Sequence, residues 1–284
     1  MAVREVLPEE YDELDQKLEK ELPLSICGLV HFRLMRRKHL LTEKMVLVDS
    51  WPDFSVLVIV DRQRREIFPI AVCFCRGPDF VSTLDTMLHS AWGELSSPMF
   101  AVGSSCDVND ALVNQYKSET SCPFRQNHDK AVVYTLPADS SVPIPMPDGF
   151  RETELSERHL DVLCKTWPYS KSNEFSSTER WLKYHICNFP TVCIETDDGC
   201  PVAWELQQEY GSVGMLHVEP EYRRKKLGSI VSRTLANKLN KGGHLVLALV
   251  TENNDPSVKF HEKNGYVRLP FKISFLGCFF ETKQ

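Results

Sequence analysis

Apolar positions along this chain follow two different spacings, and together they predict a protein of mixed helices and strands. Between residues 9 and 22, leucines and a tyrosine recur every three or four positions among acids and lysines, which predicts an amphipathic helix. Residues 56–60 are all apolar and mostly β-branched, as is typical of a strand buried on both faces. The short apolar run at 26–32 is predicted to be a strand as well.

The rest of the first half continues in short elements separated by polar or glycine-containing turns. The expected elements are a strand at 67–75 after a polar turn at 61–66, a helix around 84–91, a helix at 107–117 and a strand at 130–136. They make the first half an α/β unit in which no chemical motif stands out.

The second half predicts a more regular series of elements. The series is strand 150–153, helices 157–167 and 177–188, strands 191–195, 201–208 and 212–218, helix 227–239, strand 245–250, helix 255–263 and a last strand from 266. Leu227, Val231, Leu235 and Leu239 give the third helix a stripe of leucine and valine on one face.

A proline-rich segment separates the two halves. Residues 137–149 hold four prolines, two serines and a glycine, so they can join neither a central strand nor a helix interior. We therefore predict an N-terminal α/β domain over 1–136, a linker over 137–149 and a second domain over 150–284.

Composition narrows the class of protein. The chain has 284 residues, a net charge of −6 and 42% hydrophobic residues, and no apolar run approaches the roughly 20 residues that a membrane span needs. Arg62, Arg64 and Arg65 are interpreted as the solvated tip of a hairpin, because the chain is acidic overall and no aromatic residues interleave them. We expect a soluble protein that neither spans a membrane nor binds nucleic acid.

The cysteines and the first residues indicate the compartment. Ten cysteines are scattered without a Cys-x-x-Cys pair, which favours free thiols in a reducing compartment over disulfides or a zinc site. Cys73 and Cys75 share one face of a strand, but no further ligands lie near them in sequence, so no bound metal is expected. Acids at positions 5, 9, 10 and 12 are unlike a secretory or import signal. We expect a cytoplasmic protein, with the mitochondrion as the alternative.

One stretch, residues 218–229, has the chemistry of an anion site. It runs from the end of a strand through four consecutive cations, Arg223, Arg224, Lys225 and Lys226, into a helix that begins near Gly228. A helix start offers unpaired N–H groups and a partial positive charge, which together favour a bound phosphate group. The alternative is a solvated cluster of charges, which the helix dipole disfavours unless an anion is present.

This stretch and the order of elements resemble the GNAT superfamily of acyl-CoA-dependent N-acyltransferases. The matching residues are Val218-x-Pro220-x-Tyr222-Arg223 with Leu227-Gly228, and Phe260-x-x-Lys263-Asn264-Gly265-Tyr266 after Asn254. A closer resemblance, across both halves, is to the glycine N-acyltransferase family. It rests on Leu22-Pro23-x-Ser25, Val48 to Phe54, Asn188 to Cys193, Pro201-Val202-Ala203-Trp204 and Pro220 to Arg224.

The resemblance implies a fold and a reaction. We expect a GNAT-type mixed sheet flanked by helices in the C-terminal half and a degenerate GNAT-like domain before it. The implied reaction joins acyl-CoA to the amino group of glycine or another small amino acid and releases CoA. Two alternatives remain open, a GNAT enzyme that acylates a protein or another amine, and a catalytically weak CoA binder.

The resemblance also assigns the coenzyme site. The residues that would hold acyl-CoA are Leu216, Val218, Arg223, Arg224, Lys225, Lys226, Gly228, Ser229 and Asn254. The superfamily loop usually has glycine at the position of Lys226, so we expect this lysine to have a negative φ. Asn254 is expected to contact the pantetheine or to cap the last helix.

The residue that accepts the amine's proton is open among several candidates. Relatives that use a glutamate carry it where this chain has Ser212, whose hydroxyl could at most hold a water that takes the proton. His217 titrates in a useful range, or is a partly buried histidine that faces a helix. His261 would protonate the departing thiolate, or is an ordinary surface histidine. Glu205 and Glu209 could be bases or could simply be exposed.

Overall fold

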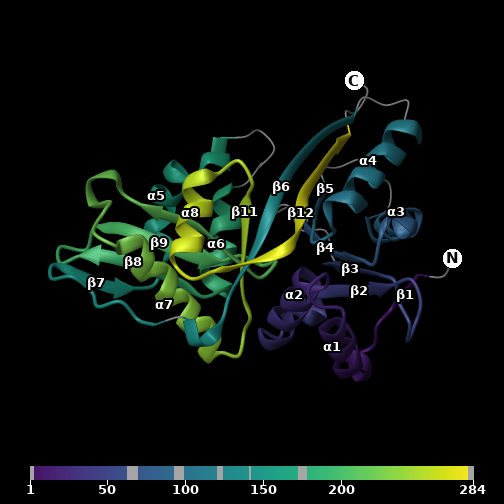
Figure 1. The fold of residues 1–284 in the computed structure, drawn as a ribbon, viewed down its shortest axis with the longest axis horizontal. Coiled ribbons are helices and arrows are strands. Elements are labelled where there is room, and N and C mark those ends of the chain that lie inside the picture. The colour runs from purple at the N-terminus through teal and green to yellow at the C-terminus, as the bar shows by residue number, and fades with distance from the viewer. Residues whose placement is uncertain are drawn as a thin grey trace. The chain divides into compact units, whose positions relative to one another are not determined.

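The computed structural model describes residues 3–62, 70–92, 99–119, 124–140, 142–171 and 178–280 (Figure 1). The chain divides into two compact units, Met1–Val132 with Leu269–Gln284, and Val133–Arg268. The predicted linker at 137–149 therefore falls just inside the second unit, and the C-terminal residues are grouped with the first. The tip of the predicted hairpin at 61–66 lies largely outside the described residues.

The first unit is a sheet with helices against it. Its elements are β1 (Arg4–Glu5), α1 (Tyr11–Lys20), α2 (Ile26–Arg37), β2 (Lys44–Val48), β3 (Val56–Asp61), β4 (Ile70–Cys75), α3 (Val81–Trp92), β5 (Met99–Val102), α4 (Cys106–Glu119) and β6 (Phe124–Leu136). The strand order is β1-β2-β3-β4-β5, with the C-terminal part of β12 (Val267–Phe280) beside β5. Only the β4–β5 pair among these described pairs is parallel.

The sheet of the first unit is buried on both faces, as the continuous apolar run of β3 predicts. Val56, Val58 and Val60 face one cluster, together with Leu84, Met87 and Leu88 of α3. Leu57 and Phe74 face α2, where a Cβ added to Gly28 would lie 3.3 Å from Leu57 and 3.6 Å from Phe74. The helix approaches this closely because glycine has no side chain.

The strand predicted at 26–32 is wrong, because these residues open helix α2. Nine of its twelve residues are buried, including Cys27, Leu29, Val30 and Phe32. A short stretch that is apolar on nearly every side has no visible period, so it does not distinguish a buried helix from a buried strand. The helix at 9–22 and the helix at 107–117 are confirmed as α1 and α4.

The second unit contains the elements that the sequence predicts for the second half. They are β7 (Phe150–Thr153), α5 (Leu160–Thr166), α6 (Thr178–Asn188), β8 (Thr191–Thr196), β9 (Pro201–Gln207), β10 (Ser212–Val218), α7 (Leu227–Lys241), β11 (Val246–Thr251) and α8 (Asp255–Lys263). The strand order is β6-β11-β10-β9-β8-β7. The β10–β11 pair is parallel, and the β10–β9, β9–β8 and β8–β7 pairs are antiparallel. Helix α7 packs on β8, β9 and β10, and its predicted apolar stripe is buried.

The same order of elements occurs twice along the chain. Each series has a short strand, two helices, three antiparallel strands, a helix, a strand parallel to the third, a helix and a final strand. The final strand of the second series supplies the partner of β5, with Leu276 opposite Ala101. The last residues of β6, from 133 on, belong to the second unit, whose strand order places β6 next to β11. The predicted mixed α/β fold with two related halves is confirmed.

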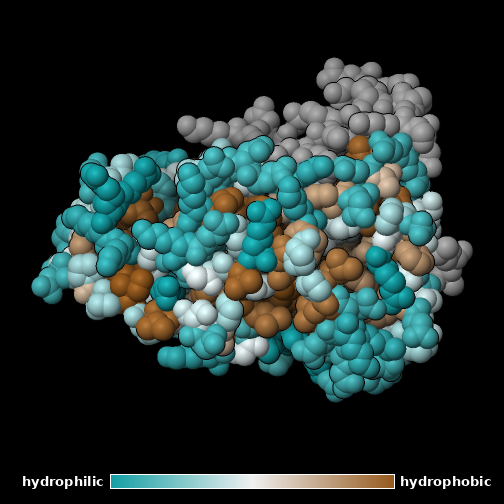
Figure 2. Space-filling model, viewed as in Figure 1, coloured by the Kyte–Doolittle hydropathy of each residue, from teal (hydrophilic) through white to brown (hydrophobic). Residues whose placement is uncertain are grey.

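The described surface is mostly polar. Polar residues cover most of the face seen in Figure 2, and apolar residues form smaller patches among them. Within the ranges that the structure describes, no helix is long and apolar enough to cross a bilayer.

Candidate active site

Strand β10 carries a bulge at its middle. Its pairing with β9 runs from Gly214 opposite Leu206 to His217 opposite Trp204, so three steps along β10 match two along β9. Met215 takes up the extra residue with a left-handed φ of 57°. The parallel register with β11 joins Ser212 and Val213 to Leu247 and Ala248, all before the bulge. Within the register of these described strands, the second half of β10 therefore presents backbone groups that β11 does not pair.

Ser212 stands at the point where β10 and β11 part. Its hydroxyl accepts a hydrogen bond from the backbone N–H of Leu249 at 3.1 Å and donates one to the carbonyl of Val213 at 2.9 Å. Its exposed fraction is 1%. Both contacts connect backbone segments of the sheet, so the hydroxyl has a structural task, and its predicted part in catalysis stays a prediction.

The loop from β10 to α7 contains two left-handed residues that are not glycine. Arg224 has a φ of 66° and Lys226 a φ of 63°. The expected negative φ at Lys226 is wrong, because the chain keeps a turn that suits glycine although it carries a lysine there. A left-handed residue with a side chain costs about 1–2 kcal/mol, and strain of this kind concentrates at ligand-binding sites.

Replacing Lys226 separates the strain in this turn from the charge. Lys226→Gly removes the ammonium group and relieves the left-handed backbone, whereas Lys226→Ala removes the same charge and keeps the strain. The glycine variant is expected to unfold with a free energy about 1 kcal/mol higher than that of the alanine variant. Urea unfolding of both proteins measures this difference. Equal stabilities would contradict the left-handed turn.

Helix α7 begins at Leu227 without a capping side chain on Lys226. The N–H groups of a first helical turn have no partner within the helix, and they carry the positive end of its dipole. Gly228 lets this helix start approach its neighbours, because an added Cβ would lie 3.3 Å from Val218 and 3.5 Å from Phe260. Ser229, in the same turn, is partly exposed. The arrangement suits an anion bound at the first turn.

The four cations of this loop are all exposed, but they are not equivalent. The Arg223 Nε donates a hydrogen bond to the carbonyl of Val218 at 3.0 Å. The Lys225 Nζ lies 5.2 Å from the ring centre of Tyr222 and 5.6 Å from that of Phe150. These two side chains fix positive charge beside the end of β10 and the short strand β7. The predicted contacts of all four cations with a pyrophosphate stay a prediction.

His217 lies on the bulged half of β10, next to Val218. Its ring stacks on Trp204 of β9, with centroids 4.7 Å apart and planes 20° from parallel. Its Nε2 lies 3.6 Å from a carboxylate oxygen of Glu219. Burial is the largest influence on the pKa of His217 and lowers it, Glu219 opposes the shift and Arg223 adds to it. The neutral imidazole is therefore favoured around neutral pH.

His261 lies on α8 and is buried, so it is not an ordinary surface histidine. Its Nδ1 lies 2.7 Å from the carbonyl of Ser257, which places the ring proton on Nδ1 and a lone pair on Nε2. The ring packs against Tyr134 and Tyr266. Burial lowers its pKa, so the ring favours the neutral form, which has no Nε2 proton to give. Its role as the acid that protonates the thiolate stays a prediction.

Asn254 caps helix α8, which was one of its two expected roles. Its side-chain oxygen accepts a hydrogen bond from the backbone N–H of Ser257 at 3.3 Å. The helix begins at Asp255, directly after this cap. Leu216 and Val218, expected to bind acyl-CoA, are partly exposed on the bulged strand.

Glu205 and Glu209 are not exposed, so that reading of them is wrong. Their exposed fractions are 1% and 4%. Burial raises the pKa of Glu205 to about 8, and a hydrogen bond with Ser232 of α7 opposes the shift. Ser232 also lies 3.0 Å from the hydroxyl of Tyr266. Glu205 therefore faces the core under α7 and not the bulged face of β10.

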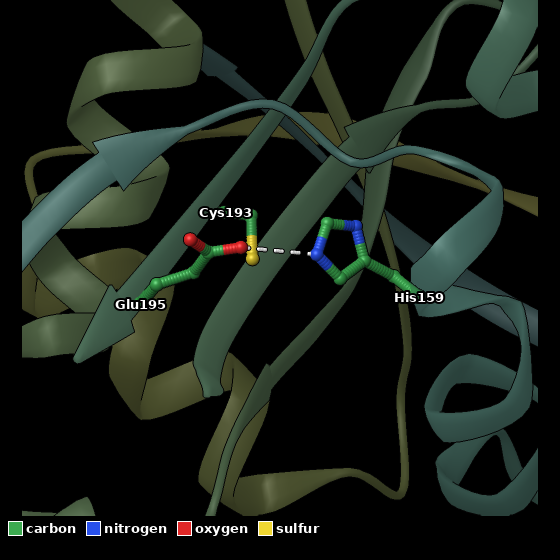
Figure 3. A group of neighbouring side chains, drawn as sticks. All are labelled: His159, Cys193 and Glu195. Atoms are coloured by element: carbon green, nitrogen blue, oxygen red, sulfur yellow. Dashed lines mark hydrogen bonds and ion pairs between the residues drawn. The ribbon is translucent and has the colours of Figure 1, made fainter. Parts of the chain in front are cut away.

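A buried group of polar residues that the sequence did not reveal lies on β8. Figure 3 shows His159, Cys193 and Glu195 pointing toward one another, with possible ligand atoms within 4.8 Å. The two nitrogens of His159 already face the N–H of Ser156 at 2.9 Å and Glu195 at 3.1 Å. Burial raises the pKa of the Cys193 thiol to about 12, which keeps it protonated.

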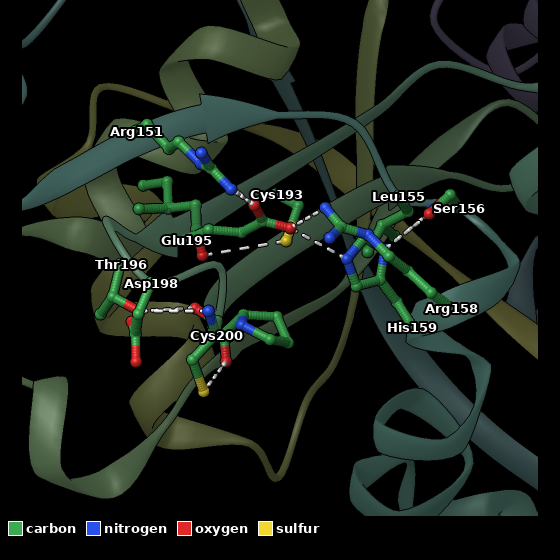
Figure 4. Close-up of polar contacts among 12 residues, drawn as sticks. Arg151, Leu155, Ser156, Arg158, His159, Cys193, Glu195, Thr196, Asp198 and Cys200 are labelled. Carbon is green, nitrogen blue, oxygen red and sulfur yellow. Dashed lines mark hydrogen bonds and ion pairs between the residues drawn. The ribbon is translucent and has the colours of Figure 1, made fainter.

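Two arginines complete this group. Arg151 and Arg158 both bond the carboxylate of Glu195, from the two sides seen in Figure 4. The charge of the glutamate is thus already balanced, and both atoms that His159 could offer a metal are in use. The arrangement is that of a structural ion-paired cluster, which holds β7, β8 and the residues before α5 together.

Comparison of the sequence with known proteins identifies similar families. A protein-family model described as FR47-like protein matches residues 193–273. Human glycine N-acyltransferase is 31% identical over 298 aligned residues, which cover 93% of this chain and 95% of the human protein. The chain belongs to the glycine N-acyltransferase family. Bovine glycine N-phenylacetyltransferase is a more distant relative, 23% identical over 74% of this chain and 76% of its own.

Solved structures share the fold of this glycine N-acyltransferase family member. The X-ray structure of a Drosophila protein matches with a TM-score of 0.77 and 16% identity, over 97% of both chains. A GCN5-related N-acetyltransferase from Kribbella flavida matches with a TM-score of 0.57 and 13% identity, over 90% of this chain and 95% of that one. The resemblance to the GNAT superfamily, expected from the Pro-x-Tyr-Arg loop, is confirmed for the fold.

Proposed function

We propose that this protein transfers an acyl group from acyl-CoA to the amino group of glycine or of another small amino acid. Family membership over 93% of the chain supports the reaction, since the human relative is named a glycine N-acyltransferase. The products would be the N-acyl amino acid and free CoA.

One observation carries the proposal, namely the bulged end of β10 followed by a strained loop and an uncapped helix start. Left-handed loop residues and the first turn of a helix are backbone features that bind phosphate groups, and their succession here supports a site for the pyrophosphate of CoA. The backbone groups of β10 that β11 does not pair are suited to hydrogen-bond the pantetheine arm and the thioester oxygen. Arg223 and Lys225 add fixed positive charge.

The chemistry demands little of side chains. A thioester is already activated, so the site has to align an amine with it, stabilise the developing oxyanion and accept one proton. Backbone amides that are fixed before the reaction stabilise the oxyanion without reorganising.

The direct test follows thiol release from acyl-CoA in the presence of a panel of amino acids. We expect release that depends on enzyme and on glycine or another small amino acid, with the N-acyl product identified by mass spectrometry. Release with a peptide amine and with no amino acid would favour a GNAT enzyme that modifies proteins. Tight CoA binding with no thiol release from any amine would leave a CoA binder and overturn the proposal.

A double variant in the loop between β10 and α7 tests the coenzyme site in the same assay. Arg224→Gly with Lys226→Gly removes two charges but keeps both left-handed turns available. It is expected to raise the KM for acyl-CoA and to leave the KM for the amino acid unchanged. The opposite pattern would place the coenzyme elsewhere.

A further inference from the structure

The end of β10 and the residue that follows it bring an imidazole, His217, close to a carboxylate, Glu219. Val218 points toward α7, since its side chain lies against Gly228. Neighbouring residues of a strand point to opposite faces, so His217 and Glu219 both point away from α7. The alternation is confirmed by the stacking of His217 on Trp204, its partner across the β9 ladder.

The ring of His217 is packed against Trp204 on one face and is enclosed at its Nε2 atom. Trp204 is 1% exposed and supports one face of the ring. The Nε2 atom is buried and has no hydrogen-bond partner among the residues that the structure describes, while the nearest carboxylate oxygen of Glu219 lies 3.6 Å away. The side chain as a whole keeps 23% of its surface exposed. With Nε2 enclosed beside Glu219, Nδ1 is the nitrogen left for a substrate.

Among the other candidates, Ser212 and His261 are bonded to backbone groups, and Glu205 faces the core under α7. The Ser212 hydroxyl binds Leu249 and Val213, and the His261 Nδ1 proton binds the carbonyl of Ser257. His217 differs from both in its position, because it lies on the bulged half of β10, whose backbone groups β11 does not pair within the register of the described strands.

The geometry points to His217 as the base that accepts the proton of the amino-acid substrate, with Glu219 as the residue that positions its ring. The inference rests on the proposed function and names its proton acceptor. Neutral His217 keeps its Nε2 proton toward Glu219 and offers the lone pair of Nδ1. The charged groups that act on this ring are Glu219 and Arg223, and burial by Trp204 and the sheet keeps it neutral around pH 7.

The proton and electron balance of the step closes with these groups. Nδ1 takes a proton from the ammonium group of the amino acid, and the freed amine lone pair attacks the thioester carbon. The C–S bond then breaks, and the thiolate takes the second proton from the new amide nitrogen. The imidazolium, stabilised by the Glu219 carboxylate, returns its proton to solvent. The net products are the N-acyl amino acid, CoA as free thiol and one proton.

The experiment compares the pH dependence of kcat/KM in the full-length protein and two variants. In the wild type the rate should rise with pH as His217 loses its proton. His217→Gln should lower kcat by about a hundredfold or more and abolish this limb, with the KM for acyl-CoA unchanged. Glu219→Gln removes the charge that raises the pKa of His217, so the limb should move to lower pH while kcat falls.

A matched control is His89→Gln on α3. His89 is exposed and also pairs with a carboxylate, that of Asp85 at 3.0 Å, so it repeats the pair away from the bulged strand. This variant should keep the activity and the pH profile of the wild type. An active wild type with an equally active His217→Gln protein would overturn the inference alone. Unchanged pH profiles in Glu219→Gln would overturn the role of Glu219. A wild type without activity toward any amino acid would overturn the proposed function and this inference with it.

Discussion

Replacing Glu205 with glutamine is expected to stabilise the protein at pH 7 by on the order of 3 kcal/mol. The carboxyl group lies under α7 with an exposed fraction of 1%, and within the described part of the chain one of its oxygens has no hydrogen-bond partner. Burial raises its pKa from 4.5 to about 8. In the unfolded chain the group is ionised at pH 7, so folding must also bind a proton. Glutamine has about the same shape and needs no proton.

The sign of the pH dependence follows from the raised pKa. The folded protein binds this proton more tightly than the unfolded chain, so its contribution favours folding at low pH and declines as pH rises from about 4.5 to about 8. Urea unfolding of the wild type and Glu205→Gln at pH 5, 6, 7 and 8 measures the effect. The difference between the two proteins should widen across this series. A constant difference would show that Glu205 is ionised in the folded protein.

Two buried glutamates on neighbouring strands of the second unit have pKa values that are shifted in opposite directions. Glu205 on β9 has a hydroxyl neighbour, Ser232, and no cation among the causes of its shift. Glu195 on β8 is equally buried, but two arginines and a histidine surround its carboxylate. Burial alone would raise the pKa of Glu195, yet the bonds from Arg151 and His159 and the charges of both arginines bring it below its usual value. The neighbouring charged groups, and not the depth of burial, therefore decide whether the pKa of each glutamate is raised or lowered.

Local sequence patterns were sufficient for the part of the site that lies within one stretch of chain. Residues 212–229 form the strand, loop and helix that their composition predicts, because a bulged strand, four cations and a helix start are consecutive in sequence. The left-handed φ of Lys226 was missed, since the sequence shows a lysine where only tertiary packing imposes the turn. His217 and Glu219 are two residues apart at the end of β10, a spacing that in an extended chain brings both side chains to one face.

Contacts between distant segments could not be predicted from such patterns. Glu195 meets Arg151, Arg158 and His159, which precede it by 44, 37 and 36 residues. Nothing in a single chain shows that these segments meet before the register of β7 on β8 is known. Helix α2 was missed for a related reason, because burial on all sides erases the period that separates a helix from a strand.

Glu195→Gln is expected to destabilise the protein at pH 7 by about 2 kcal/mol. The change removes the buried charge that Arg151 and Arg158 share, and it turns an amide group toward donors that need an acceptor. Breaking a fully buried ion pair costs about 3–5 kcal/mol, but the two arginines are 54% and 56% exposed, so solvent compensates part of the loss. The Nε2 of buried His159 also loses its charged partner.

The depressed pKa of Glu195 sets the pH range of this effect. A carboxylate with a lowered pKa contributes stability above its unfolded value of 4.5, and the contribution is lost as pH falls through the folded value. The difference in the free energy of unfolding between the wild type and Glu195→Gln should therefore be constant from pH 8 to 6 and become smaller below pH 4.5. Its sign is opposite to that of the difference for Glu205→Gln. Urea unfolding of the two variants side by side makes each the control for the other. Stabilisation by both substitutions would mean that the arginines do not compensate the buried carboxylate, and destabilisation by both would mean that Glu205 has a partner in the folded core.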